Sequence, residues 1–92
     1  IQDEYDNEIP FVEKTAEKIY HVIASASIDD INEMLPHPVS KDKKYETLAG
    51  LLIFKFGKIP NVRERIQIDD YEFIILKRSK SSVLLVQMND LL

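Results

Sequence analysis

The apolar stretch at residues 48–56 limits what this chain can fold into more than any other segment. Its sequence, LAGLLIFKF, holds seven apolar side chains and is interrupted only by Gly50 and Lys55. A membrane-spanning helix needs about 20 consecutive apolar residues, so this stretch has about half the required length. The stretch is therefore predicted to be a helix buried in a globular core, and the chain itself is not expected to span a membrane.

The ends of this helix are marked by residues that cap helices. Thr47 is a favourable N-cap residue, Gly57 suits the C′ position, and Pro60 stops the helix from continuing. A glycine inside a helix costs about 1 kcal/mol relative to alanine. Gly50 therefore indicates that another backbone segment approaches the helix closely.

The apolar surface of this helix leaves two interpretations open. A helix that is apolar on most sides is either buried on most sides or shared with a partner. One face is formed by Leu48, Leu51, Leu52 and Phe56. Four residues belong either to the core or to a protein contact surface. They are Ile53 and Phe54 of the helix and the strand positions Leu84 and Val86.

A second helix is predicted near residues 28–35. Ser27 is a good N-cap residue, and Asp29 and Asp30 place negative charge in the first turn, where the helix dipole favours it. Pro36 and Pro38 stop the helix. Its apolar face is predicted to contain Ile28, Ile31, Met34 and Leu35.

The remaining periodic segments have the alternation typical of strands. A hairpin with its turn at Glu17-Lys18 precedes the helices, and a three-stranded meander with turns at Asp69-Asp70 and at residues 79–82 follows them. The predicted strands lie near residues 10–16, 19–24, 65–69, 71–78 and 83–88. The predicted fold class is α+β, a single small domain in which an antiparallel sheet packs with the two helices.

Composition narrows the possible chemistry. With 92 residues, a net charge of −4 and no cysteine, the chain has room for one core and excludes disulfides, zinc–thiolate sites and thiol nucleophiles. Nucleic-acid binding is not expected, because it needs a basic patch. Two distant histidines, His21 and His37, do not provide the three or four ligands of a zinc site.

The first residues form an acidic segment that is interpreted as the junction to a preceding domain. Residues 1–9 are therefore separated from the domain at residues 10–92. Carboxylates favour Mg²⁺ and Ca²⁺, which makes this segment a weak candidate for a divalent-cation site. The interpretation as a solvated junction is favoured. The candidate ligands are Asp3, Glu4, Asp6 and Glu8.

Three motifs resemble the CorC/HlyC transporter-associated domain. They are SIDDINEML at residues 27–35, YETLAGLLIFKFGKIP at 45–60 and IQIDDYEFIILKR at 66–78. The residues that match the family pattern are Asp29, Asp30, Ile31, Asn32, Tyr45, Thr47, Gly50, Gly57, Pro60, Tyr71 and Phe73. The chain departs from the family at Ala24 and Arg63, where the family usually has glycine, so the geometry of these two turns is expected to differ slightly.

The resemblance implies a cytosolic accessory domain rather than an enzyme. Domains of this family are the C-terminal parts of haemolysin-like and magnesium and cobalt efflux membrane proteins, where they follow CBS domains and are thought to modulate ion transport. The expected partners are therefore the CBS-like and membrane domains of a longer protein, and a homodimer stays open. The family fold is similar to a subdomain of p-cresol methylhydroxylase-type FAD-binding proteins, so a nucleotide- or FAD-binding sensor is the alternative function.

Overall fold

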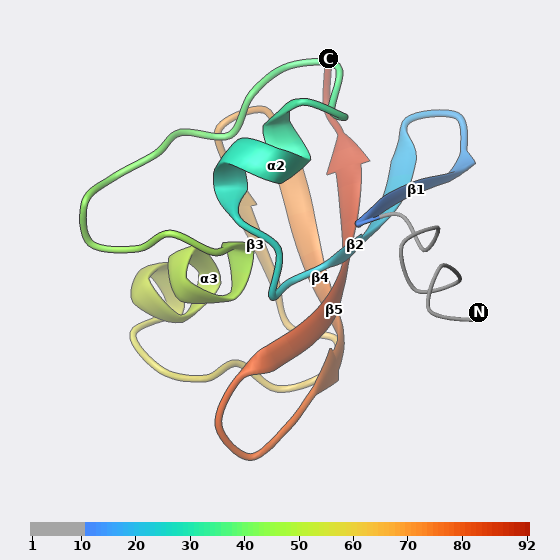
Figure 1. The fold of residues 1–92 in the computed structure, drawn as a ribbon. Helices are drawn as coiled ribbons and strands as arrows, with labels where there is room; N and C mark the ends of the chain where they lie inside the picture. The colour runs from blue at the N-terminus through green and yellow to red at the C-terminus, as the bar shows by residue number, and fades with distance from the viewer. Residues whose placement is uncertain (1–10) are drawn as a thin grey trace, which may run out of the picture.

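Five antiparallel strands form one sheet in the computed structural model, which describes residues 11–92 (Figure 1). The strands follow the order β1-β2-β5-β4-β3, so β5 is the central strand and β1 and β3 are the edges. The chain runs through β1 (Val12–Ala16), β2 (Ile19–Ile23), α2 (Ile28–Asn32), α3 (Leu48–Phe56), β3 (Arg65–Ile68), β4 (Tyr71–Arg78) and β5 (Val83–Asp90). The predicted α+β class and antiparallel sheet are confirmed.

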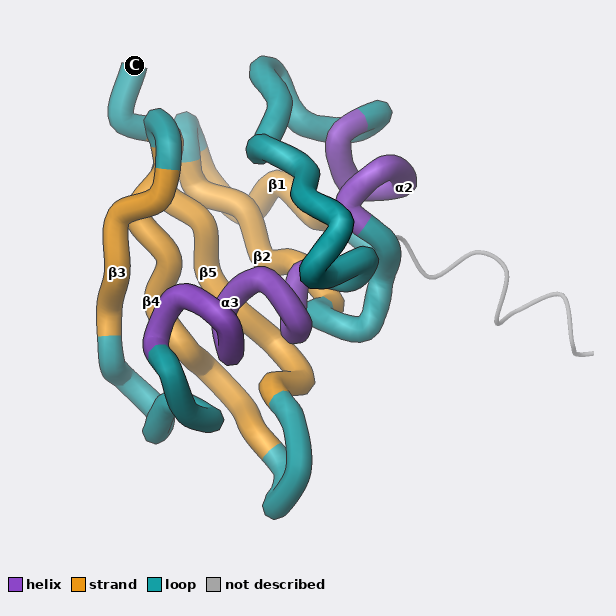
Figure 2. The backbone as a smooth tube through the Cα atoms, turned by 90° about the vertical axis from the view of Figure 1, so that its left-hand side faces the viewer, coloured by secondary structure: helices purple, strands orange, loops and turns teal. Residues whose placement is uncertain are grey.

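Both helices lie on the same face of the sheet, as Figure 2 shows. The alternation of buried and half-buried residues in β4 and β5 is what a sheet with one covered face requires. In β4, Tyr71, Phe73 and Ile75 point toward the helices and are fully buried, whereas Glu72 and Ile74 between them are half-buried. The domain therefore has two layers.

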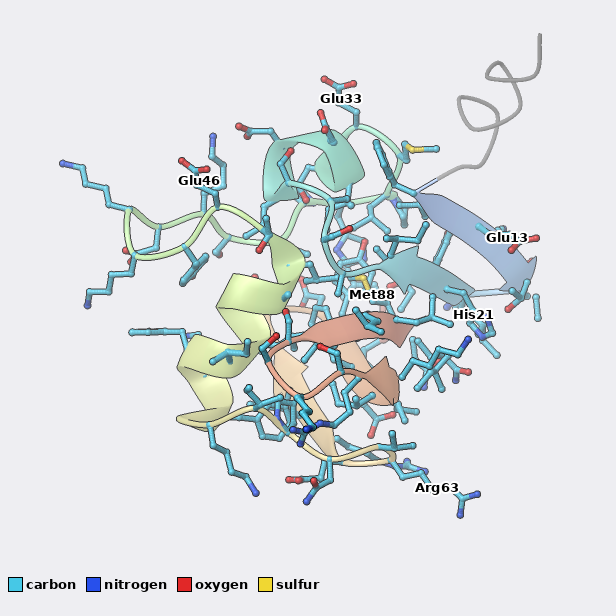
Figure 3. The ribbon with its side chains drawn as sticks, turned by 60° about the horizontal axis from the view of Figure 1, so that its bottom comes forward. Glu13, His21, Glu33, Glu46, Arg63 and Met88 are labelled. Carbon is cyan, nitrogen blue, oxygen red and sulfur yellow. The ribbon has the colours of Figure 1, made fainter. Side chains whose placement is uncertain are left out.

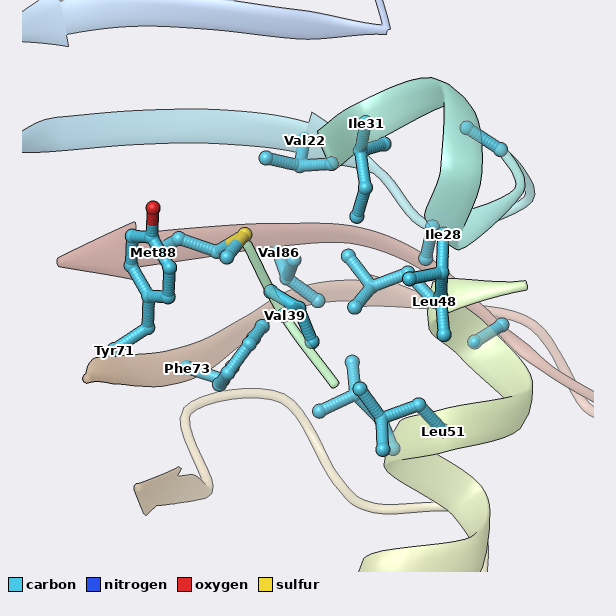
Figure 4. Close-up of a cluster of buried hydrophobic side chains, with 14 of the residues drawn as sticks. Val22, Ile28, Ile31, Val39, Leu48, Leu51, Tyr71, Phe73, Val86 and Met88 are labelled. Carbon is cyan, nitrogen blue, oxygen red and sulfur yellow. The ribbon is translucent and has the colours of Figure 1, made fainter. Parts of the chain in front are cut away.

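The core forms where α2, α3 and the covered sheet face meet (Figure 4). Leu48 and Leu51 of α3 pack in this region with Phe73 of β4 and Val86 of β5. All of these side chains are fully shielded from solvent. At about 25 cal/mol for each Å² of buried apolar surface, such contacts are the main favourable contribution to folding.

Helix α2 is shorter than predicted because the side chain of its last residue binds the following loop. The helix was expected to extend to residue 35, but it ends at Asn32. The Asn32 amide donates to the Val39 carbonyl (3.0 Å) and accepts from the Val39 N–H (2.9 Å). These two bonds fold residues 33–39 back onto the helix, which leaves Met34 48% exposed, while Leu35 is buried. The prediction that Met34 lies on the buried face was wrong.

The four residues that were open between core and contact surface do not all belong to one class. Val86, a candidate contact residue, is fully buried, and Ile53 packs against the core. The proposed contact role of Val86 was therefore wrong. Phe54 and Leu84 are exposed.

Several strand ends differ by one or two residues from the predicted ones. Strand β2 stops at Ile23 because the chain turns at Ala24, and β3 stops at Ile68 because Asp69 adopts a positive φ of 57° in the hairpin turn. Strand β5 runs past residue 88 to Asp90, since Asn89 and Asp90 still pair with Glu72 and Tyr71. Strand β1 begins at Val12. Residue 10 lies outside the described part of the chain.

Within residues 11–92, the structure has no helix that is both long enough and apolar enough to cross a membrane. The longest apolar helix is α3, with nine residues. This agrees with the interpretation of residues 48–56 as a core helix.

Candidate functional site

The tyrosine, threonine and glycine before and within α3 form a helix-start motif. The Thr47 hydroxyl accepts a hydrogen bond from the Gly50 N–H at 3.0 Å, as an N-cap residue should. A β-carbon at Gly50 would lie 3.1 Å from the Cβ of Tyr45. The close neighbour that the sequence predicted at Gly50 is therefore Tyr45 of the preceding loop, and these three residues shape the entry into α3.

The acidic motif of α2 also has local partners. The Ser27 hydroxyl accepts from the Asp30 N–H at 3.0 Å, which confirms Ser27 as the N-cap. Asp29 is exposed and pairs with Lys41 at 2.6 Å. Asn32 holds the loop at Val39, as described above.

Gly57 and Pro60 shape the exit from α3. Gly57 has a φ of 77° and donates to the Ile53 carbonyl, so it forms the predicted left-handed C-cap. The Arg78 guanidinium of β4 donates to the carbonyls of Ile59 and Pro60, both at 3.2 Å. These bonds hold the connection between α3 and β3 against the sheet.

Tyr71 and Phe73 belong to the core, and Tyr71 also has a polar contact. The Tyr71 hydroxyl donates to the His37 carbonyl at 2.7 Å, and the two rings stack with centroids 4.3 Å apart. Burial raises the pKa of Tyr71 to about 12. The ring of Phe73 meets that of Tyr71 edge-on at 6.3 Å.

His37 also contacts the end of the sheet. Its Nε2 lies 2.8 Å from Asp90 Oδ1. This contact, together with the bond from the Leu92 N–H, lowers the pKa of the Asp90 carboxyl. His37, Tyr71 and Asp90 thus form a clasp between the loop after α2 and the end of β5, and the motifs had given no indication of Asp90.

Within the described part of the chain there is no assembled metal site. Within residues 11–92, no three His, Asp or Glu side chains are close enough to hold a metal ion. His37 belongs to the clasp, and His21 lies on the other face of the sheet, where its Nε2 is 3.3 Å from Gln87 Oε1. The acidic candidates Asp3, Glu4, Asp6 and Glu8 lie outside the described residues, so the cation site stays a prediction.

A cleft of about 730 Å³ lies between the start of α2 and the loop before α3. Its lining includes Asp29 and Asp42 as well as Lys41 and Lys43, so it carries charges of both signs. Lys41 already pairs with Asp29. The cleft gathers no set of groups that favours one ligand charge.

The feature that stands out is the sheet face turned away from the helices, which we call the open sheet face. No described helix covers it (Figure 2). In Figure 3, His21 and Glu13 lie on the opposite side of the molecule from α3. By strand register, its members are Phe11, Glu13, Ile19, His21, Ile23, Arg65, Gln67, Glu72, Ile74, Lys77, Leu85, Gln87 and Asn89.

Apolar side chains make up a large part of the open sheet face. Ile23 of β2 pairs with Leu85 of β5, and the Ile23 N–H donates to the carbonyl of Phe11, which extends this apolar row toward the edge. Ile19 and Ile74 add two further aliphatic side chains, both half-buried. Phe11 is 42% exposed. The row of Phe11, Ile23 and Leu85 is apolar surface of the kind that usually marks an interaction site.

A chain of polar contacts crosses the same face over four strands. His21 contacts Gln87, the Gln87 amide donates to Asn89 Oδ1 (3.0 Å), and the Asn89 amide donates to Glu72 Oε1 (3.2 Å). Glu72 in turn lies 3.5 Å from the Arg65 guanidinium. This chain orients the polar side chains of the face before any partner binds.

The open sheet face was not among the features predicted from the sequence. The polar or apolar character of alternate residues in 19–23 and 85–89 was a usable signal, because residues two apart in a strand share a face. That signal does not reveal which strands are neighbours. The pairing of β2 with β5, which completes the face, joins segments more than 60 residues apart.

Comparisons with known proteins identify the family. Residues 13–91 match the family model CorC_HlyC, described as a transporter associated domain. The chain is 30% identical to Hemolysin C of Brachyspira hyodysenteriae over 91 residues, which cover 99% of the chain and 34% of that protein. It is 34% identical to the magnesium and cobalt efflux protein CorC of Escherichia coli K12 over 90 residues, which cover 96% of the chain and 30% of that protein.

Solved structures show the same fold. The transporter associated domain CorC_HlyC from Nitrosomonas europaea has a TM-score of 0.77 and 28% identity, over 86% of this chain and 94% of that one. A CorC_HlyC domain from a Xylella fastidiosa hemolysin in complex with Mg²⁺ and Mn²⁺ has a TM-score of 0.75 at 21% identity, over 89% and 99% of the two chains. The FAD-protein similarity stays a prediction. The chain spans about a third of the length of the curated relatives it matches, and it belongs to the CorC_HlyC family of transporter-associated domains.

Proposed function

We propose that this chain is a non-catalytic accessory domain of a longer ion-transport protein of the haemolysin or magnesium and cobalt efflux type. In this role it modulates transport through protein contacts. The family and the names of the relatives support this role. The observation that carries it is the open sheet face, which offers apolar surface and ordered polar groups for a protein contact.

The placement of the domain follows from the same proposal. CBS-like and membrane domains in the rest of a longer protein are the proposed neighbours, and the cytoplasmic side of the membrane is the proposed location. The junction from Asp3 to Pro10 is proposed as the pivot about which the domain moves as a rigid body. A modulating domain must have two arrangements that affect the membrane part differently. The single small core built from α2, α3 and the sheet favours movement of the whole domain over a switch inside it.

The test is deletion of residues 10–92 from the longer transporter that carries this chain. Ion flux is measured in vesicles after membrane insertion and protein amount have been matched. We expect transport to persist with a changed rate or a changed response to cytosolic ions. The matched control is the full-length protein with Lys55→Glu, an exposed change on α3 that should leave flux unaltered.

Two results would contradict this role. A deletion protein that inserts normally but transports nothing would make the domain a structural part of the transporter. Unchanged flux together with an unchanged ion response would remove the modulatory role altogether.

Divalent-cation sensing is a second candidate. It is favoured by the acidic segment and by the name of the Xylella fastidiosa structure, which contains Mg²⁺ and Mn²⁺. Calorimetric titration of the chain with Mg²⁺ should show saturable heat that disappears when Asp3, Glu4, Asp6 and Glu8 are all changed to their amides. Equal heats for both proteins would exclude that segment as the site.

The nucleotide- or FAD-sensor alternative finds no support in the glycine positions. Phosphate cradles need glycine-rich turns. Both glycines of the chain belong to α3, one in its first turn and one at its C-cap.

A further inference from the structure

We infer that the open sheet face binds a second copy of this chain, related by a two-fold axis that runs parallel to β5. The starting observation is that this face combines apolar surface with charges at opposite ends. The inference does not depend on the transport role, and it can be tested on the 92-residue chain alone.

The two end charges lie in one row across the sheet. Glu13 pairs with His21, His21 with Gln87, Gln87 with Ile74, and Ile74 with Arg65. The row therefore begins with a negative charge on edge strand β1 and ends with a positive charge on edge strand β3. With strands about 4.8 Å apart, these ends are separated by four spacings, or about 19 Å.

A two-fold axis brings the negative edge of one copy over the positive edge of the other. When two open sheet faces stack about an axis parallel to β5, each β1 lies over the β3 of the other copy. Glu13 of each copy then faces Arg65 of the other copy, which also lies 3.5 Å from Glu72 of its own chain, and this makes two equivalent charge contacts. An interface of this kind is self-complementary, as a two-fold dimer requires.

On the same axis, β5 places Leu85 beside the polar side chains of Gln87 and Asn89. Leu85 lies on the central strand β5 and therefore faces the Leu85 of the other copy. Ile23 and Ile74, on the strands at either side of β5, add apolar area around it. Apolar side chains near the middle of the face, together with charges at its two edges, agree with the usual arrangement of a protein interface.

The charge balance of the face favours a second copy over a strongly charged partner. The chain has a net charge of −4, but the face carries Glu13 and Glu72 against Arg65 and Lys77. It is therefore neutral without His21. Stacking about an axis perpendicular to the strands would instead place Glu13 over Glu13 and Arg65 over Arg65, which like-charge repulsion disfavours.

The small size of the face predicts weak association. A five-stranded sheet about 19 Å wide is at the low end of specific interfaces. We expect a dimer dissociation constant between about 10 μM and about 1 mM for the isolated chain. In a longer protein, tethering would raise the effective concentration and make the same contact substantial.

Charge reversal and charge exchange test the pairing. Sedimentation equilibrium up to about 1 mM chain should show a monomer–dimer equilibrium. Glu13→Arg and Arg65→Glu should each weaken it at least about tenfold, and the double variant, in which the charges are exchanged, should recover to within about threefold. The matched controls are Glu33→Arg and Lys55→Glu, which reverse exposed charges on the helix side. Circular dichroism checks that each variant is folded.

Cross-linking gives a second readout that does not depend on affinity. The chain has no cysteine, so introduced thiols are unique. A mixture of Glu13→Cys and Arg65→Cys chains should form a disulfide between the two variants on oxidation. Glu13→Cys alone should form almost none, because its two copies would be about 19 Å apart.

Several outcomes would overturn the inference. These are a chain that stays monomeric at about 1 mM, single reversals no weaker than the controls, an exchange variant that does not recover, or efficient linking of Glu13→Cys to itself. A monomer that dimerises only after removal of residues 1–10 would assign the face to that segment instead.

Discussion

At the scale of single residues, Arg63 holds a backbone shape that glycine favours. Its φ of 79° lies in the left-handed region, and its N–H donates to the Ile75 carbonyl at 2.7 Å. The resemblance to a family with glycine at this place predicted a slightly different turn, and that comparison stays a prediction. In this chain the turn has a shape suited to glycine, with an exposed arginine in it (Figure 3). At Ala24, by contrast, φ is not positive, so a buried methyl group is accommodated.

Arg63→Gly should stabilise the chain. A left-handed conformation costs an L-residue about 1–2 kcal/mol, and glycine avoids this cost. Glycine also loses more conformational freedom on folding, which reduces the gain by about 0.5–1 kcal/mol. We therefore expect the free energy of unfolding to rise by up to about 1 kcal/mol, measured by urea denaturation. Arg63→Ala keeps the β-carbon and should bring no such gain. A clear loss of stability in the glycine variant would mean that the arginine side chain stabilises the turn.

At the scale of elements, α3 has one face in the core and one at the surface. Leu51 and Leu52 are fully buried, whereas Phe54 is 47% exposed. The ring of Phe54 still has neighbours, because Tyr45 lies 5.7 Å away between centroids and the Lys44 ammonium lies 5.2 Å from its centre. The helix is therefore a core element whose outer side is partly covered by the preceding loop.

Truncations on the two sides of α3 should differ in cost. Leu51→Ala or Leu52→Ala should lower the free energy of unfolding by about 2–5 kcal/mol, because each leaves a cavity in a packed core. Phe54→Ala should cost about 1 kcal/mol or less, since the ring is half in solvent and the lysine contact is exposed. Chemical denaturation of the three variants compares them. Similar losses at all three positions would show that α3 is covered on both sides.

At the scale of the whole molecule, the clasp of His37, Tyr71 and Asp90 joins parts of the chain that are far apart in sequence. His37 belongs to the loop after α2, Tyr71 begins β4, and Asp90 ends β5. The charged groups near the clasp are Lys18 of the first hairpin, whose Nζ donates to the Leu92 carbonyl, and Asp70. The clasp thus ties the loop layer to the end of the sheet.

Asp90→Asn should change how stability depends on acid. The pKa of Asp90 is lowered below its ordinary value of 3.8, first by His37 and then by the Leu92 N–H. A lowered carboxyl pKa stabilises the fold above the pKa of the unfolded chain, and this contribution is lost as the pH falls through the folded pKa. The stability advantage of the unchanged chain over Asp90→Asn should therefore be present at neutral pH and disappear below about pH 4.

Urea denaturation at several pH values measures this difference. The control is Asp70→Asn, a change at an exposed neighbouring carboxylate. The difference in unfolding free energy between the unchanged chain and this variant should not show the same dependence on pH. An advantage over Asp90→Asn that persists unchanged into strong acid would show that the clasp does not depend on the ionised carboxylate.

The sequence alone determined the features that depend on neighbours along the chain. Ser27, Thr47 and Gly57 mark helix ends because a cap acts within one turn of the helix. The two-residue alternation located all five strands, because it depends only on local geometry. The motif residues identified the family, although their structural roles, such as the contact of Tyr45 with Gly50, required coordinates.

Only the tertiary structure decided what arises between distant segments. Helix α2 ends early because Asn32 binds Val39 across a loop, and the propensities of residues 33–35 do not encode that bond. The pairing of β2 with β5 and the placement of both helices on one face create the open sheet face. The alignment of Glu13 with Arg65 in one row likewise results from four strand pairings. The register between strands is set by packing over the whole sheet and not by the residues within one strand.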